Sequence, residues 1–110
     1  MEQLYKLVTI YRKVDDEQKL ETFFASVHLQ LAEQLPGLLK TELTRIYGKP
    51  GGESRFHLMY TLYFANKNDY EAAMLSEVGQ QLFQALIPWA EARLLTWFNG
   101  EAFADKVSTH

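Results

Sequence analysis

The sequence predicts an α+β fold in which four strands and two helices belong to a single domain. The first observation is length, because 110 residues is the usual size of one folding unit. The second is that runs of β-branched and aromatic residues alternate with stretches that carry apolar residues at helical spacing. The third is an apolar share of 47%, which is enough to fill one core without a disulfide or a metal.

The first half of the chain predicts a strand, a long helix and a second strand. Residues 4–11 are rich in β-branched and aromatic side chains, which is typical of a strand. Asp15 and Asp16 can cap a helix, and Pro36 ends it because proline cannot continue a helical turn. Apolar residues between these positions repeat at helical spacing: Leu20, Phe23, Phe24, Val27 and Leu31. Residues 38–47 then predict the next strand.

The middle of the chain predicts a hairpin followed by a helix. Glycine and proline gather in residues 48–54, which favours a turn between the second strand and a third strand at 55–64. A helical pattern begins after Asn66, restarts at Ser76 and is expected to stop at Pro88.

The end of the chain predicts one more strand, at residues 94–98. Residues 102–110 predict a C-terminal tail outside the domain of residues 1–101. The resulting order is β-α-β-β-α-β, which is the ferredoxin-like arrangement. In this arrangement the strands form a four-stranded antiparallel sheet, the first and third strands are central, and the helices cover one face.

Both faces of this sheet are predicted to be apolar. Along the third strand, Phe56, Leu58, Tyr60, Leu62 and Phe64 alternate with His57, Met59, Thr61 and Tyr63. The helices can cover one face only, and no segment remains for the other. We therefore expect a second copy of the chain to cover it, which predicts a homodimer through the sheet face.

Charge, cysteine content and motifs exclude several classes of function. A net charge of -3 makes nucleic acid an unfavourable partner. No window approaches the ~18 apolar residues of a membrane span, and the N-terminus lacks a signal-peptide pattern, so we expect a cytoplasmic protein without a membrane partner. Without cysteine, histidine pairs at metal-ligand spacing or a phosphate-binding glycine motif, the sequence predicts no metal and no cofactor.

Several short motifs resemble those of the EthD-like proteins within the dimeric α/β-barrel group. In the first half the similar segments are 7–13, Phe24, 28–32 and 36–38. In the second half they are 62–64, 69–74 and 76–80. The resemblance covers roughly residues 6–98. Gln30 stands where the family often has proline, and Val78 where it often has a small or acidic residue.

This resemblance implies a bacterial cytoplasmic homodimer whose two sheets close into a barrel, with a ligand cavity in some members. The family's namesake is linked to the degradation of ethyl tert-butyl ether beside a cytochrome P450 system. Related barrels include cofactor-free monooxygenases, muconolactone-type isomerases and polyketide cyclases.

His28 is the polar position that matches the family, and it lies at the edge of the buried stripe of the first helix. A histidine there could act as a general acid or base near neutral pH. Tyr11 and Tyr63 are the tyrosines whose hydroxyls we expect to assist it. The alternative is a structural histidine that packs by its ring or bonds to a carbonyl.

A ligand pocket is expected on the side of the sheet that faces the barrel. Its predicted lining residues are Thr9, His57, Met59, Thr61 and Trp97, together with Tyr11 and Tyr63. Aromatic rings with a few hydroxyl donors suit an apolar, ring-shaped ligand. Ordinary dimer packing explains the same residues and is the alternative.

Two functions follow from these patterns. The first is a protein that binds or transforms a small apolar or aromatic compound without a cofactor, by proton transfer, isomerase or cyclase chemistry, or monooxygenase-like chemistry, in catabolism alongside an oxygenase. The alternative is a non-catalytic accessory dimer that binds a metabolic enzyme, such as an oxygenase. RNA binding by the sheet is disfavoured because the chain is acidic and lacks the required aromatic and basic run.

Overall fold

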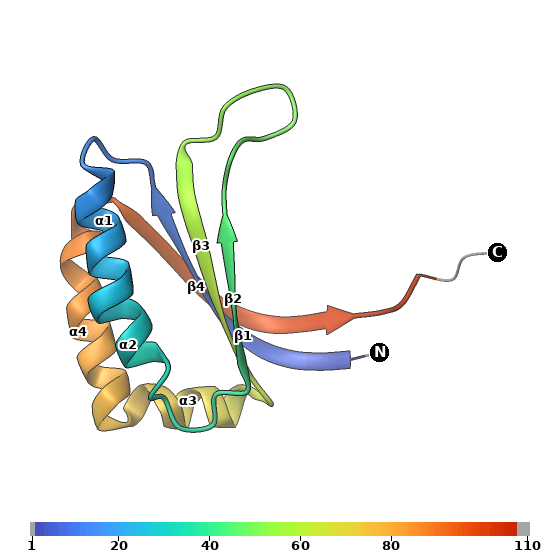
Figure 1. The fold of residues 1–110 in the computed structure, drawn as a ribbon. Helices are drawn as coiled ribbons and strands as arrows, with labels where there is room; N and C mark the ends of the chain where they lie inside the picture. The colour runs from blue at the N-terminus through green and yellow to red at the C-terminus, as the bar shows by residue number, and fades with distance from the viewer. Residues whose placement is uncertain (1, 108–110) are drawn as a thin grey trace.

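Four antiparallel strands form one layer of the computed structural model, and helices form the second layer (Figure 1). The structure describes residues 2–107. The strands are β1 (Glu2–Arg12), β2 (Lys40–Arg45), β3 (Phe56–Phe64) and β4 (Leu95–Ala104). Their order in the sheet is β2-β3-β1-β4, so β1 and β3 are central. The predicted ferredoxin-like α+β fold is confirmed.

The helices all lie on one side of the sheet. They are α1 (Glu17–Phe23), the π-helical turn η1 (Phe24–His28), α2 (Leu29–Ala32), α3 (Lys67–Leu75) and α4 (Glu77–Glu91). The first three form one continuous rod that lies beside α4, and α3 lies at one end of the layer (Figure 1). None of the helices within residues 2–107 is both long and apolar enough to cross a membrane.

Side chains cap the helices where the sequence predicted. The carboxylate of Asp16 accepts the backbone N–H of Lys19 at the start of α1. The side chain of Asn66 accepts the N–H of Asp69, which begins α3. The hydroxyl of Ser76 accepts the N–H of Gly79 and begins α4. These bonds satisfy N–H groups that the first turn of a helix leaves free.

The end of α4 differs from the prediction, because the helix passes through Pro88 and ends at Glu91. Proline lacks an N–H, but its own carbonyl still accepts the N–H of Ala92 at 3.1 Å. The N–H groups of Arg93 and Leu94 then bond to the carbonyls of Ala90 and Trp89, at 3.0 and 2.9 Å. The extra turn places Trp89 on the helix, facing the end of β1.

The last strand is longer than the predicted 94–98. β4 pairs with β1 from Tyr11 opposite Leu95 to Glu2 opposite Ala104. It therefore includes three residues of the segment 102–110 that was expected to be a tail. The reason is that β1 itself begins at Glu2 and offers backbone partners this far. Residues 108–110 of that segment lie outside the described residues.

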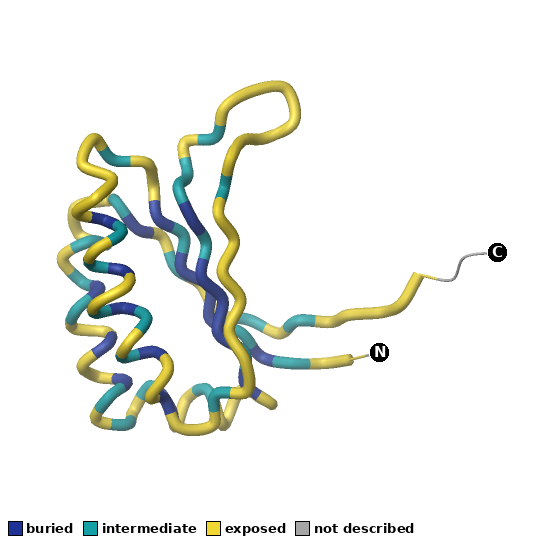
Figure 2. The backbone as a smooth tube through the Cα atoms, viewed as in Figure 1, coloured by how far each residue is buried: buried dark blue, intermediate teal, exposed yellow. Residues whose placement is uncertain are grey.

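The core lies between the helices and the middle of the central strands. In Figure 2 the buried segments follow β1 and β3 and the inner sides of the helices, whereas β2 is exposed along its length. The largest buried side chains include Tyr11, Tyr60, Phe64, Leu20 and Leu82. They belong to one apolar cluster, which contains Leu20 and Phe24 of the predicted helical stripe but not Val27.

The second face of the sheet has no helix over it (Figure 1). Residues opposite one another on paired strands share a face. Val8 lies opposite Thr61 and Phe98, and Ile10 lies opposite Met59. We call the side that carries these five residues the open face. It has an apolar centre, as predicted, and no helix within residues 2–107 lies over it, although Val8 and Thr61 are only 1% and 2% exposed in the single chain.

Candidate functional site

The hydroxyl of Tyr11 and the imidazole of His28 meet in the core. The hydroxyl oxygen lies 2.6 Å from Nδ1 of the ring. Tyr11 is 0% exposed and His28 is 1% exposed. Tyr11 comes from the end of β1 and His28 from the last position of η1. The fold thus brings two of the predicted catalytic residues into direct contact.

The π-helical turn helps to place His28. Its wide turn is closed by a bond from the N–H of Leu29 to the carbonyl of Phe24, one residue further than in an α-helix. Phe24 and His28 both point into the core, with their rings 5.3 Å apart. Tyr60 packs edge-on against His28 at 5.2 Å. Aromatic rings therefore hold the imidazole against Tyr11. Short π-helical turns of this kind are often found at functional sites.

Burial keeps both members of the pair uncharged. It lowers the pKa of His28 to about 3 and raises the pKa of the Tyr11 hydroxyl. Because burial raises its pKa, the hydroxyl keeps its proton, and Nδ1 is the one acceptor for that proton within residues 2–107. We therefore assign the hydroxyl as the donor and Nδ1 as the acceptor. The proton of the neutral imidazole is then carried by Nε2. The pair is a buried proton donor bonded to a neutral base.

The two single replacements in this pair are expected to lower the unfolding free energy by more, when summed, than the double replacement does. Tyr11→Phe leaves Nδ1 without a donor, and His28→Phe leaves the hydroxyl without an acceptor, at about 1–3 kcal/mol each. In the double variant neither polar group remains, so its loss should be smaller than the sum by about 1 kcal/mol or more. Urea unfolding at one protomer concentration measures all three. Strictly additive losses would contradict a coupled pair.

The third candidate catalytic residue, Tyr63, lies away from this pair. It is opposite Lys6 on β1 and therefore belongs to the open face. Its hydroxyl donates to Glu42 at 3.4 Å, and the ammonium of Lys40 lies 4.7 Å from the centre of its ring. Burial and then Glu42 raise the pKa of Tyr63. Tyr63 cannot act with His28, because the sheet separates them.

The predicted pocket residues also divide between the two faces. Thr9 lies opposite Tyr60 and Trp97, on the helix side with Tyr11. Met59 and Thr61 lie on the open face with Tyr63. The expectation that all of them line one cavity was wrong. Its cause is the register, which places odd-numbered residues of β1 opposite even-numbered residues of β3.

His57 lies on the helix side, not beside Met59. The register of β3 against β1 shifts between Tyr11 and Arg12, which marks a β-bulge at His57. Nε2 of His57 lies 2.6 Å from a carboxylate oxygen of Glu21, on α1. Arg45 of β2 binds the same carboxylate through two bonds of 2.9 and 3.0 Å. The bulge thus links the sheet to α1 through Glu21.

Replacing Glu21 with glutamine is expected to reduce the amount of unfolding free energy that the protein loses on acidification. Arg45, and then His57, lower the folded-state pKa of Glu21 from 4.5 to about 2. The carboxylate therefore stabilises the fold fully above pH 4.5, and this contribution is lost as the pH falls towards 2. We expect less than about 1 kcal/mol, because the pair is partly exposed.

Urea titrations across this pH range measure the effect. Wild type should lose more unfolding free energy on acidification than Glu21→Gln does. Glu53→Gln, which changes an exposed carboxyl in the loop between β2 and β3, is the matched control and should follow wild type. If Glu21→Gln also followed wild type, the ion pair would contribute nothing to the acid response.

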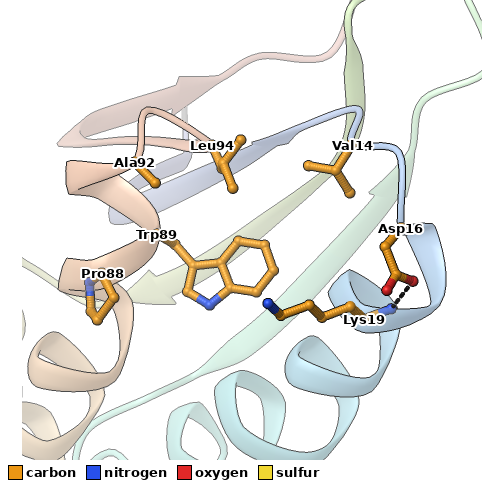
Figure 3. Close-up of a pocket in the computed structure, with 7 residues that line it drawn as sticks. All are labelled: Val14, Asp16, Lys19, Pro88, Trp89, Ala92 and Leu94. Carbon is orange, nitrogen blue, oxygen red and sulfur yellow. Dashed lines mark hydrogen bonds between the residues drawn. The ribbon is translucent and has the colours of Figure 1, made fainter.

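A pocket of about 260 Å³ opens between the start of α1 and the end of α4 (Figure 3). It is lined by Val14, Asp16, Lys19, Pro88, Trp89, Ala92 and Leu94. We call it the Trp89 pocket. The indole of Trp89 packs against Phe23 at 4.9 Å and edge-on against Tyr11 at 5.7 Å, measured between ring centres. One side chain therefore separates the pocket from the Tyr11–His28 pair.

Sequence reasoning missed the Trp89 pocket because it expected the helix to end before Trp89. A second hollow, of about 150 Å³, lies between α4 and β4 and includes Trp97, one of the predicted pocket residues. The Trp97 ring stacks on Phe83 at 5.2 Å. For the Trp89 pocket, the signal in the sequence was the pair Pro88 and Trp89, which stands just before the turn into β4.

The fold is similar to those of several solved structures. An ethyl tert-butyl ether D (EthD) family protein from Bacillus halodurans C-125 is 31% identical, with a TM-score of 0.83 over 91% of this chain and 99% of that one. SnoaB, a cofactor-independent oxygenase from Streptomyces nogalater, is 13% identical, with a TM-score of 0.62 over 97% of each chain. A dimeric ferredoxin-like protein from Jannaschia sp. CCS1 is 18% identical, with a TM-score of 0.62 over 91% of this chain and 99% of that one. The last two likenesses concern the fold alone. No protein-family model and no curated protein matches the sequence.

Proposed function

The chain belongs to the EthD family, and from this premise we propose that it is a homodimer that binds or transforms a small apolar or aromatic compound without a cofactor. The observation that carries the proposal is the Trp89 pocket, whose inner wall touches the buried Tyr11–His28 pair. The pocket offers an apolar site, and the pair offers a proton donor and acceptor close behind it.

The open face supports the homodimer. Its centre is apolar, and Phe98 is 48% exposed there in the single chain. An apolar sheet face is usually covered by another layer, and a two-fold copy of the same sheet provides one. The Jannaschia protein of the same fold is described as dimeric, which agrees with this assembly.

Proton transfer in this site requires Trp89 to move. In the closed arrangement the indole packs between the pocket and Tyr11. When a ligand displaces the indole, the Tyr11 hydroxyl can bond to the ligand, and Nδ1 of His28 can accept its proton. His28 then acts as the base and Tyr11 as the relay. The resting pair is neutral, so the step depends on a ligand group that stabilises the new charge.

A panel of phenols, lactones and aromatic acids tests ligand binding by thermal stabilisation. Compounds that bind should raise the melting temperature of wild type, and Trp89→Ala should lose this increase. Trp97→Ala, which alters the second hollow, is the matched control and should retain it. The proposal would be wrong if no compound stabilised wild type, or if only Trp97→Ala removed the effect.

Catalysis is tested separately, by exchange of a carbon-bound hydrogen of the bound compound with deuterium from solvent. Wild type should catalyse the exchange, and Tyr11→Phe should abolish it while ligand binding remains. Binding without exchange would reject the proton-transfer role. The alternative of an accessory dimer for a metabolic enzyme would gain support if the dimer formed but no small compound bound.

A further inference from the structure

The Trp89 pocket holds one ammonium group that forms no ion pair with a described side chain. Only Asp16 and Lys19 among its lining residues are charged. The carboxylate of Asp16 is engaged, because one of its oxygens accepts the backbone N–H of Lys19 at 3.0 Å and caps α1. The ammonium of Lys19 forms no hydrogen bond or ion pair within residues 2–107. Among the described residues, the charged group that is left without a partner at this site is therefore the ammonium of Lys19.

The uncharged residues that line the Trp89 pocket are apolar, and one of them, Trp89, offers a flat aromatic ring. Val14, Pro88, Ala92 and Leu94 surround the indole of Trp89. In Figure 3 the Lys19 side chain extends from α1 towards this indole, so the ammonium and the ring face the same space. A volume of about 260 Å³ is below that of most drug-sized sites and suits a molecule of one or two rings.

From this arrangement we propose that the ligand is a planar aromatic carboxylate, with its ring against Trp89 and its carboxylate on the ammonium of Lys19. The inference rests on the proposed function and names the class of compound that the same site would take. Offset or edge-on stacking favours an aromatic ring beside the indole. Charge complementarity selects an anion over a neutral or cationic compound. Lys19 then determines specificity and orientation, and it takes no part in moving the proton.

This orientation has a consequence for the buried pair. Lys19 belongs to α1, at the rim of the pocket, whereas Trp89 contacts Tyr11 on the inner side. A carboxylate held at the rim directs the opposite end of the ring system towards Trp89 and Tyr11. The end remote from the carboxylate is therefore the end nearest to the proton relay, which it reaches when the indole is displaced.

The test compares 2-naphthoate with 2-naphthamide, which share ring system and size but differ in charge. The indole N–H signal of Trp89 in nitrogen–proton spectra reports binding, and Trp97→Phe assigns it by removing the other indole signal. In wild type the carboxylate should bind about fivefold more tightly than the amide at low salt. Added salt should weaken binding of the carboxylate only.

Lys19→Gln should abolish the preference by weakening carboxylate binding to the level of the amide, with amide affinity unchanged. Lys67→Gln, at an exposed lysine of α3, is the matched control and should keep the preference. Equal affinities in wild type, or a preference that survives Lys19→Gln, would overturn the inference and leave the proposed function standing. If neither compound moved the Trp89 signal, the inference would fail, and failure of the whole panel would remove the proposed function as well.

Discussion

Replacing Phe98 with lysine is expected to convert the protein from a dimer into a monomer. Phe98 lies opposite Val8 on the open face and is 48% exposed in the single chain. In the proposed two-fold dimer the substitution would occur twice in the interface. Lost apolar contact and two buried ammonium groups should together cost about 4 kcal/mol or more, which weakens association by about a thousandfold.

Sedimentation across a range of protein concentrations measures this change. Leu75→Lys is the matched control, because Leu75 is a 75% exposed apolar residue at the end of α3, on the helix side of the sheet. It should remain as dimeric as wild type. A wild-type protein that sedimented as a monomer, or a Phe98→Lys variant that stayed dimeric, would contradict association through the open face.

Replacing Gly79 with alanine is expected to destabilise the fold, although alanine normally favours a helix by about 1 kcal/mol over glycine. Gly79 lies in the first turn of α4, where this helix meets α3. A Cβ atom there would overlap the carbonyl oxygen of Ala73 and lie 2.8 Å from the Cα atom of Met74. Both are backbone atoms, so the two helices would have to separate. We expect a net loss of about 2–3 kcal/mol.

Thermal and urea unfolding at a fixed protomer concentration measure the loss, which should lower the melting temperature by about 10 °C or more. Gly52→Ala is the matched control, because a Cβ atom at Gly52 meets nothing within 4 Å. Its stability should stay within about 0.5 kcal/mol of wild type. A Gly79→Ala protein as stable as wild type would show that the contact between α3 and α4 adjusts freely.

Local patterns were sufficient to predict the fold. Caps at Asp16, Asn66 and Ser76 begin the helices where the sequence suggested, because a capping side chain and the helical turn it caps are close in sequence. Strand ends were less well predicted. β4 continues to Ala104 because β1 offers it a partner, and this pairing depends on residues about a hundred positions away.

The site was predicted only in part, because it depends on register. The sequence indicated His28 and Tyr11 separately, and the contact between them needs the π-helical turn as well as the strand that carries Tyr11. Which residues share a face depends on the pairing of Tyr11 with Leu58. A bulge then moves His57 to the helix side. Alternation within one strand reveals neither the pairing nor the bulge.

We place the ligand between the helices and the sheet, at Trp89, and not between the two sheets of the proposed dimer. Nuclear Overhauser contacts between a bound aromatic compound and the protein distinguish these positions directly. We predict contacts from the compound to the indole of Trp89 and to the methyl groups of Val14 and Leu94, which line the pocket. Contacts to the side chains of Ile10 and Met59, on the open face, would instead place the ligand inside the barrel and contradict the account.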